Sequence, residues 1–144
     1  MKTSTKLNVG QVYTRAVLKS MFKITDATIN NGIFQPTGHE SLWLFITEKK
    51  TPDRPQYNDL LKGDDLRWES QPRGRKDHLI VGHVARGLEV LVFYRRKQNE
   101  FKGSGFKYEG RFYYVSHQPG QPSQFHLRRM EKKTKPPSGK EDEV

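Results

Sequence analysis

The sequence predicts an α+β fold, a small β-rich barrel or half-barrel with one or two flanking helices. Short aromatic and β-branched runs recur along most of the chain, separated by segments rich in glycine, proline and charge, which is typical of many short strands. A helix is indicated in only two places, one near the start and one in mid-chain. With 144 residues and 33% hydrophobic content, the chain can form one compact core.

We expect a single folded domain over residues 10–130. Residues 1–9 are polar and lack apolar periodicity, which predicts a flexible N-terminus. Residues 131–144 are lysine, proline, serine, threonine, glycine and acidic residues up to a final valine, which indicates a disordered tail or a linker.

A first helix is expected from Arg15 to Phe22. Thr14 is a favourable N-cap, and the apolar residues that follow it have helical rather than alternating spacing. A second, short helix is expected over Asp77–Arg86, because this segment does not alternate cleanly and ends at Gly87, a residue suited to a C-cap.

Three runs in the middle of the chain predict strands. Ser41–Thr47 and Leu88–Arg95 are almost continuously apolar or aromatic, as expected for buried strands. Asp65–Ser70 alternates polar and apolar residues, so Leu66 and Trp68 should share its inward face.

Three further strands are expected in the last third of the chain, over Phe106–Gly110, Arg111–His117 and Gln124–Met130. A charged, glycine-containing loop precedes the first of them. A hairpin is the economical connection from Leu88–Arg95 across this loop.

The charge balance favours a polyanionic partner. There are 26 Lys and Arg against 16 Asp and Glu, a net charge of +10, so nucleic acid is preferred to an anionic membrane surface. The absence of cysteine excludes disulfides and thiolate zinc sites and fits a reducing cytoplasm. No signal peptide and no run near the ~18 apolar residues of a membrane span is present, so we expect a cytoplasmic protein without a membrane partner.

No catalytic constellation stands out, so the chain is not expected to be an enzyme or to hold a metal or cofactor. Asp64, Asp65 and Glu69 are not followed by the spaced lysine of a metal-dependent nuclease. The five histidines lack the i, i+4 spacing of a zinc protease. His83 is expected to be a buried histidine hydrogen-bonded to a carbonyl.

Aromatic and basic residues recur side by side, a pattern in which rings stack on bases and cations hold phosphates. Trp43 and similar rings lie among apolar neighbours and are expected in the core, whereas Trp68, Tyr113 and Tyr114 have polar neighbours. The loop over residues 71–76 places three cations within four positions, which suits contact with a duplex backbone and equally an ordinary solvated loop.

An ordered set of short motifs resembles the restriction-endonuclease-associated domain of unknown function found with bacterial DEAD/DEAH-box helicases and HNH nucleases. These motifs are Trp68-Glu69-Ser70-Gln71, His83 to Gly87, Leu91-Val92-Phe93 with Arg95 and Lys97, Tyr108-Glu109-Gly110 and Tyr114-Val115-Ser116-His117. The resemblance covers about Tyr13 to Leu127.

A second resemblance is to the SRA-like domains of methylation-dependent HNH endonucleases, which read modified cytosine. It rests on Val12-Tyr13-Thr14-Arg15 and on Asn31-Gly32-Ile33 before the Trp43 strand. The Tyr-Asp-Gly segment of those readers is replaced here by Tyr57-Asn58-Asp59 and Trp68-Glu69-Ser70-Gln71. The identity of the modified base is therefore left open.

These resemblances imply an SRA/PUA-like, non-catalytic module of a bacterial restriction or anti-phage system. It would bind double-stranded DNA beside a nuclease or helicase in the same chain or operon, and flip a modified base, expected to be cytosine, into a barrel pocket. The base-pocket residues implied are Trp68 and Tyr114 as stacking walls, with Ser70, Gln71 and His117 as hydrogen-bonding groups. The residues implied to hold the DNA backbone are Arg15, Arg73, Arg75, Lys76, Arg95 and Arg96.

Two alternatives stay open from the sequence. The same loops could read a short unmodified DNA sequence through base edges in the major groove. The positive charge could instead serve a protein-interaction adaptor that recognises an acidic partner.

Overall fold

The computed structural model describes residues 2–30, 32–48, 59–70, 76–120 and 123–130. Its strands are β1 (Val12–Tyr13), β2 (Ile33–Phe34), β3 (Ser41–Thr47), β4 (Leu60–Lys62), β5 (Asp65–Glu69), β6 (Glu89–Arg95), β7 (Phe106–Gln118) and β8 (Gln124–Arg129). Its helices are α1 (Arg15–Phe22) and α2 (Asp77–Val81), with 3-10 turns η1 (Thr3–Lys6), η2 (Ala27–Asn30) and η3 (Lys102–Ser104).

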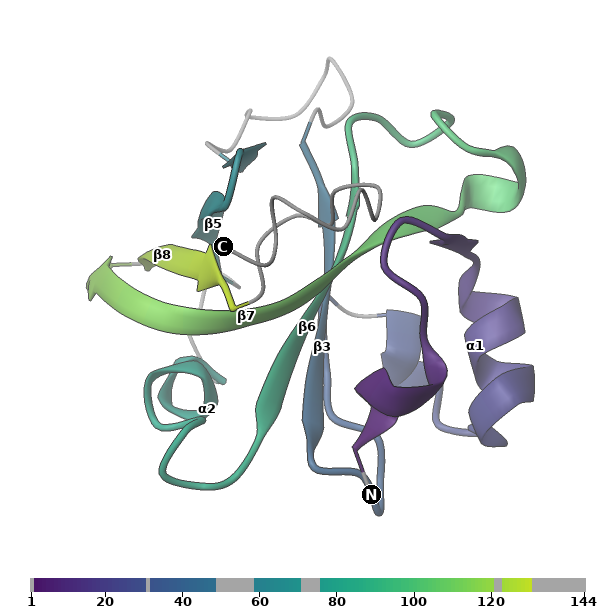
Figure 1. The fold of residues 1–144 in the computed structure, drawn as a ribbon, viewed down its shortest axis with the longest axis horizontal. Helices are drawn as coiled ribbons and strands as arrows, with labels where there is room; N and C mark the ends of the chain where they lie inside the picture. Colours follow the sequence, from purple (N-terminus) through teal and green to yellow (C-terminus); the bar gives the residue numbers. More distant parts are fainter. Residues whose placement is uncertain (1, 31, 49–58, 71–75, 121–122, 131–144) are drawn as a thin grey trace, which may run out of the picture.

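The described strands form one curved sheet in the order β2-β3-β6-β7-β8-β5-β4, and β1 pairs with one end of β7. β3 and β6 are parallel, and all other neighbouring pairs are antiparallel. The long strand β7 crosses the molecule and joins the β3/β6 half of the sheet to the β8/β5 half (Figure 1). β2 and β4 end the strand order, so the architecture is the predicted half-barrel.

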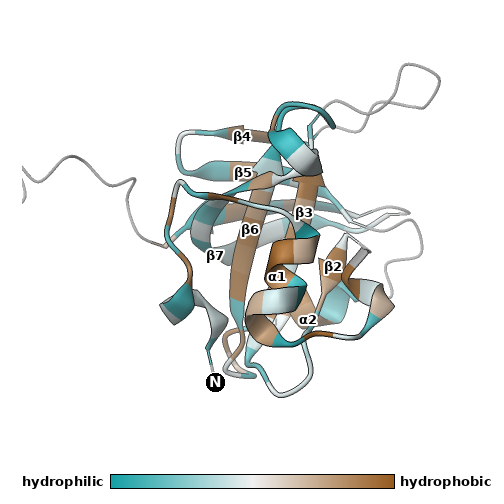
Figure 2. Ribbon diagram, turned by 90° about the vertical axis from the view of Figure 1, so that its right-hand side faces the viewer, coloured by the Kyte–Doolittle hydropathy of each residue, from teal (hydrophilic) through white to brown (hydrophobic). Residues whose placement is uncertain are grey.

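The two central strands are buried on both faces. Alternate residues of β3 and β6 enter two separate apolar clusters, one inside the curve of the sheet and one beneath α1 and the N-terminal segment. Figure 2 shows these strands hydrophobic along their length with α1 in front of them. This double burial explains why their sequences are continuous apolar runs rather than alternating ones.

The first helix agrees with its prediction in both bounds. The Thr14 side chain accepts a hydrogen bond from the Val17 amide at 3.0 Å, which caps the N-terminus of α1. The second helix is shorter than expected, because α2 ends at Val81 and the chain continues in turns to Gly87.

The two strands expected over Phe106–Gly110 and Arg111–His117 are in fact one strand, β7. Gly110 has a φ of +102°, and the pairing with β6 shifts register between Val92 and Phe93. Glycine accepts this backbone conformation without strain, so the strand takes up the bulge and continues where its sequence suggested a break.

The expectation of a flexible N-terminus over residues 1–9 is corrected for the residues described. Thr3 is fully buried and Leu7 is nearly so. The Glu89 carboxylate accepts hydrogen bonds from the Ser4 hydroxyl and from the Ser41 hydroxyl, each at 2.6 Å, and from the Ser4 amide at 3.0 Å. Polar residues thus anchor this segment through a buried acceptor 85 positions away, which no local pattern indicates. The tail over 131–144 lies outside the described residues.

None of the described helices is long and apolar enough to cross a membrane. Among the described residues, no three His, Asp or Glu side chains converge in a way that could hold a metal ion.

Candidate nucleic-acid interface

The candidate interface lies on the half of the sheet formed by β5, β8 and β7. Cross-strand pairing places side chains in rows, because residues directly opposite on neighbouring strands point to the same side. Arg67 of β5 pairs with His126 of β8, which pairs with Ser116 of β7; in the next row Glu69 pairs with Gln124, which pairs with Gln118. We call the side that carries these two rows the polar face.

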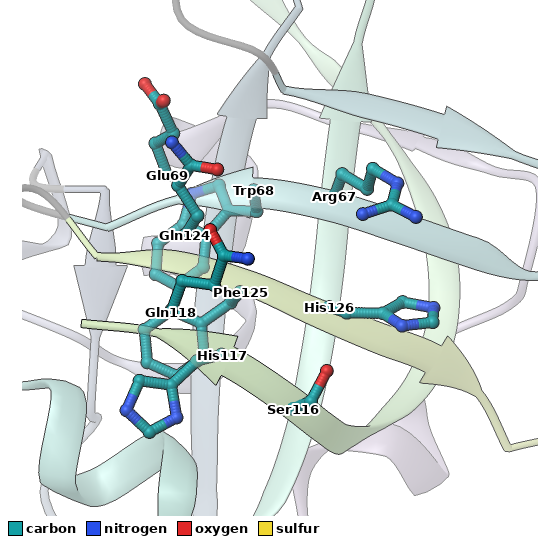
Figure 3. A pocket seen from close by; sticks show the side chains of 9 residues that line it. All are labelled: Arg67, Trp68, Glu69, Ser116, His117, Gln118, Gln124, Phe125 and His126. Carbon is teal, nitrogen blue, oxygen red and sulfur yellow. The ribbon is translucent and has the colours of Figure 1, made fainter. Parts of the chain in front are cut away.

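The polar face is hollowed. A cavity of about 260 Å³ opens there, lined by Arg67, Trp68, Glu69, Ser116, His117, Gln118, Gln124, Phe125 and His126. Figure 3 shows Glu69, Gln118 and Gln124 grouped at one end of this cavity and Arg67, His126 and Ser116 at the other. One end therefore carries amide and carboxylate groups, and the other carries a permanent positive charge.

Aromatic rings support the cavity from behind. The rings of His117 and Phe125 stack with centroids 5.0 Å apart and planes within 16° of each other. Trp68 packs against Phe125 at 5.6 Å, and Tyr114 approaches the same ring edge-on at 6.1 Å. The Tyr114 hydroxyl lies 2.7 Å from Nδ1 of His117, so the histidine ring is held in place from two sides.

A second hollow continues the polar face toward β4. It has a volume of about 280 Å³, shares Arg67 and His126 with the first, and is otherwise lined by Leu60, Lys62, Asp65 and Arg128. Asp65 accepts hydrogen bonds from Nε2 of His126 at 2.8 Å and from Nε of Arg128 at 3.0 Å. These bonds hold the pKa of the Asp65 carboxyl below its ordinary value.

Because the folded pKa of Asp65 is lowered, its contribution to stability is present above the ordinary value of 3.8 and is lost as pH falls through the folded value. We therefore expect the variant Asp65→Asn to lose less stability than the wild type as the pH is lowered below 3.8. Urea unfolding at a series of acidic pH values measures this difference. Parallel pH profiles for the two proteins would contradict it.

The described members of the predicted base pocket lie in one neighbourhood, but they are not equally accessible. Trp68 and Ser70 are each only 5% exposed, whereas Tyr114 and His117 are partly buried. The Ser70 hydroxyl accepts from the Ser123 amide at 3.2 Å, so it joins the ends of β5 and β8. Gln71, predicted beside them, lies outside the described residues.

The described members of the predicted backbone-binding set do not line the polar face, although two of them, Arg15 and Arg95, lie beside each other. Both guanidinium groups lie over the Phe106 ring, and α1, which begins at Arg15, is on the opposite side of the molecule from β8 (Figure 1). Arg96 is exposed and pairs with Glu100 at 2.9 Å. Lys76 approaches the carbonyl of Ile33 at 3.4 Å. Arg73 and Arg75 lie outside the described residues.

His83 is the buried, carbonyl-bonded histidine that its sequence context predicts. It is 2% exposed, and its Nδ1 lies 2.9 Å from the Leu88 carbonyl oxygen. Since a carbonyl only accepts, Nδ1 carries the proton and Nε2 is left to accept from the Tyr114 amide at 3.1 Å. This neutral tautomer holds β7 where its pairing with β8 shifts register, between Tyr114 and Ser116.

Several residues that line the cavity were missing from the sequence-based set, namely Arg67, Glu69, Ser116, Gln118, Gln124, Phe125 and His126. The alternation of Gln124, His126 and Arg128 in the last strand places these three on one face, and this signal is visible in the sequence. What the sequence does not show is that β8 lies between β5 and β7, which gathers the three strands' polar residues at one cavity.

Comparison with known proteins gives a match at the level of the fold. No protein-family model and no curated protein matches the chain. Among solved structures, the crystal structure of the SUVH5 SRA domain in complex with hemimethylated CG DNA superposes with a TM-score of 0.57 and 18% sequence identity, over 94% of this chain and 98% of that one. The chain has an SRA-like fold. At this identity the likeness establishes architecture alone, and the restriction-associated resemblance stays an expectation.

Proposed function

We propose that this protein is a non-catalytic reader of duplex DNA that recognises a modified base, with cytosine the expected base, flipped into the 260 Å³ cavity of the polar face. The observation that carries the proposal is the composition of this cavity. The cavity combines the amides of Gln118 and Gln124 and the carboxylate of Glu69 with basic residues at its edge, and packed aromatic rings lie behind it. The SUVH5 SRA domain, a structural neighbour, is described in complex with hemimethylated DNA, which supports the same class of ligand.

The amide groups of Gln118 and Gln124 suit the edge of a base. Each amide offers both a donor and an acceptor, and the Glu69 carboxylate offers acceptors. A base edge presents donors and acceptors in a fixed pattern, and a flipped base is read through those groups. Extrusion requires roughly a few kcal/mol of unstacking, which contacts to the flanking phosphates must offset.

We assign those phosphate contacts to three basic residues at the edge of the polar face, Arg67, Arg128 and Lys62, which we call the basic rim. Arg67 and Arg128 extend from neighbouring rows of β5 and β8, and Lys62 of β4 lines the adjoining hollow. Cations at such positions bind phosphates without regard to sequence and release counterions. Base identity is then read in the cavity, and register along the duplex is set by the rim.

We further propose that the module works with a nuclease or helicase, in the same chain or operon, of a bacterial restriction or anti-phage system. A reader without chemistry of its own needs an attached activity, and the sequence resemblance points to those two. Co-purification of this chain with a nuclease or helicase encoded beside it tests the proposal.

The test of base reading is binding to matched duplexes with and without modified cytosine or adenine, at several salt concentrations. We expect Gln124→Ala to reduce the preference for the modified duplex by about 1–3 kcal/mol, since one pair of base-edge contacts is lost. Gln98→Ala is the matched control, because Gln98 is an exposed glutamine on the turn after β6. Fluorescence of 2-aminopurine placed next to the modified base reports flipping through the loss of stacking on that side.

Each outcome decides the proposal. A preference for one modified duplex that falls in Gln124→Ala and persists in Gln98→Ala supports it and names the base. Equal binding to modified and plain duplexes would leave a general DNA-binding module, and no binding would favour an adaptor for an acidic protein.

A further inference from the structure

On the side of the molecule away from the polar face, two guanidinium groups share one aromatic ring. The Cζ atom of Arg95 lies 3.9 Å from the centroid of Phe106, and that of Arg15 lies 5.0 Å from the same centroid. Arg15 also lies 4.4 Å from the centroid of Phe45. Arginines bind well to ring faces, but two of them against one ring bring like charges together.

Both groups lose water in this position. Arg95 is only 9% exposed and Arg15 is partly buried. Burial and the neighbouring charge of Arg95 lower the pKa of Arg15 to about 10, and burial lowers that of Arg95. Among the described residues, no carboxylate forms an ion pair with either guanidinium. The pair therefore carries a positive charge that the described residues do not balance.

The two arginines differ in how their donors are used. Arg95 donates from Nε to the Thr47 hydroxyl at 2.8 Å and from Nη1 to the Ser104 carbonyl at 2.9 Å. Arg15 donates from Nε to the Ile29 carbonyl at 2.9 Å. For Arg15, the described contacts engage Nε and leave its two terminal nitrogens for another acceptor.

The surroundings also favour a negative ligand. Arg15 is the first residue of α1, so its backbone lies in the first turn of the helix, where the partial positive charge of the helix N-terminus adds to the field. The η3 turn packs against this end, because a Cβ on Gly103 would come within 3.2 Å of the Thr14 methyl. Exposed Lys102 of η3 adds a further cation nearby.

We propose that Arg15 and Arg95 form a binding site for a phosphate group, with Arg15 as the ligand-contacting residue and Arg95 as the charge that fixes η3 beside it. The bound group is either a free phosphate ion or a phosphodiester of a nucleic acid. This inference does not depend on base reading, since it concerns other residues at the other side of the fold.

The test is a titration of the full chain with sodium phosphate, and with sodium chloride at equal ionic strength, followed by ¹H–¹⁵N NMR. We expect the Nε signals of Arg15 and Arg95 and the amides of Gly103 and Ser104 to shift and saturate with phosphate only. In Arg15→Met the affinity should fall by about tenfold or more, since a charged hydrogen-bonding ligand is lost. Arg15→Lys should bind with intermediate affinity, because lysine keeps the charge but not the planar fork.

Lys19→Met is the matched control, as it removes a positive charge one turn further along α1. The remaining dispersed signals verify that each variant is folded. Shifts that rise without saturation, or equal affinity in Arg15→Met and wild type, would overturn the proposal. A second titration with a short unmodified duplex identifies the source of the phosphate: saturable shifts at Arg15 assign a nucleic-acid phosphodiester, and saturation by inorganic phosphate alone assigns the free ion.

Discussion

The double variant Arg67→Ala/Arg128→Ala is expected to bind duplex DNA about tenfold to a hundredfold more weakly at low salt, with a salt dependence reduced by about two ion equivalents. These arginines belong to neighbouring rows of the polar face, and Arg128 is 46% exposed. Both can therefore reach phosphates without rearrangement of the sheet. The affinity should fall almost equally for modified and unmodified duplexes, because phosphate contacts carry no base information.

Fluorescence anisotropy at several salt concentrations measures both the affinity and its salt dependence. The control is Lys6→Ala/Lys19→Ala, which removes two positive charges from η1 and α1 on the other side of the molecule (Figure 1). If the control variant loses as much affinity as the arginine variant, overall charge and not the polar face governs binding, and the interface is misplaced.

The variant Glu89→Ala is expected to lower the free energy of unfolding by about 3 kcal/mol, since charge-assisted hydrogen bonds are lost and a buried hydroxyl is left without its acceptor. Glu89 is 6% exposed and accepts from Ser4 and from the buried Ser41. Thr3 continues the network, because its hydroxyl donates to the Ser41 oxygen at 2.8 Å. Loss of Glu89 should therefore release the N-terminal segment from the sheet.

Urea unfolding measures the stability change, and hydrogen exchange of the amides of Ser4 and Leu7 measures the release. Glu100→Ala is the matched control, because the Arg96–Glu100 pair involves an arginine that is 72% exposed and should contribute less than about 1 kcal/mol. Unchanged protection of the N-terminal amides in Glu89→Ala would mean that the segment is held by apolar contacts such as those of Leu7.

Trp68 and Arg67 on β5 show why the candidate site was only partly predictable from the sequence. The family resemblance implied Trp68 as a stacking wall, whereas the alternation of this strand predicted that Trp68 faces inward; in the structure Trp68 is 5% exposed and packs against Phe125. Arg67, one position earlier, points to the polar face by the same alternation. The alternation therefore places Arg67 on the outward side of β5, but the cavity on that side exists only because β8 and β7 lie beside β5.

The position of Arg95 was also not predictable from the sequence. The family resemblance implied that Arg95 holds the DNA backbone. In the structure its Nε and Nη1 atoms donate to Thr47 and to carbonyls of the following turn, because the parallel partner β3 ends beside it. We therefore leave it out of the polar face.

By itself the sequence determined the properties that depend on neighbours along the chain. The capped helix α1, the doubly buried runs of β3 and β6, the alternation of β5 and β8 and the strong positive charge all follow from local spacing and composition. Only the tertiary structure decided which strands lie side by side, that β7 runs unbroken through Gly110, and that Ser4 bonds to Glu89. Those outcomes depend on packing between segments tens of residues apart, where the free energy comes from burial and long-range hydrogen bonds that no local pattern specifies.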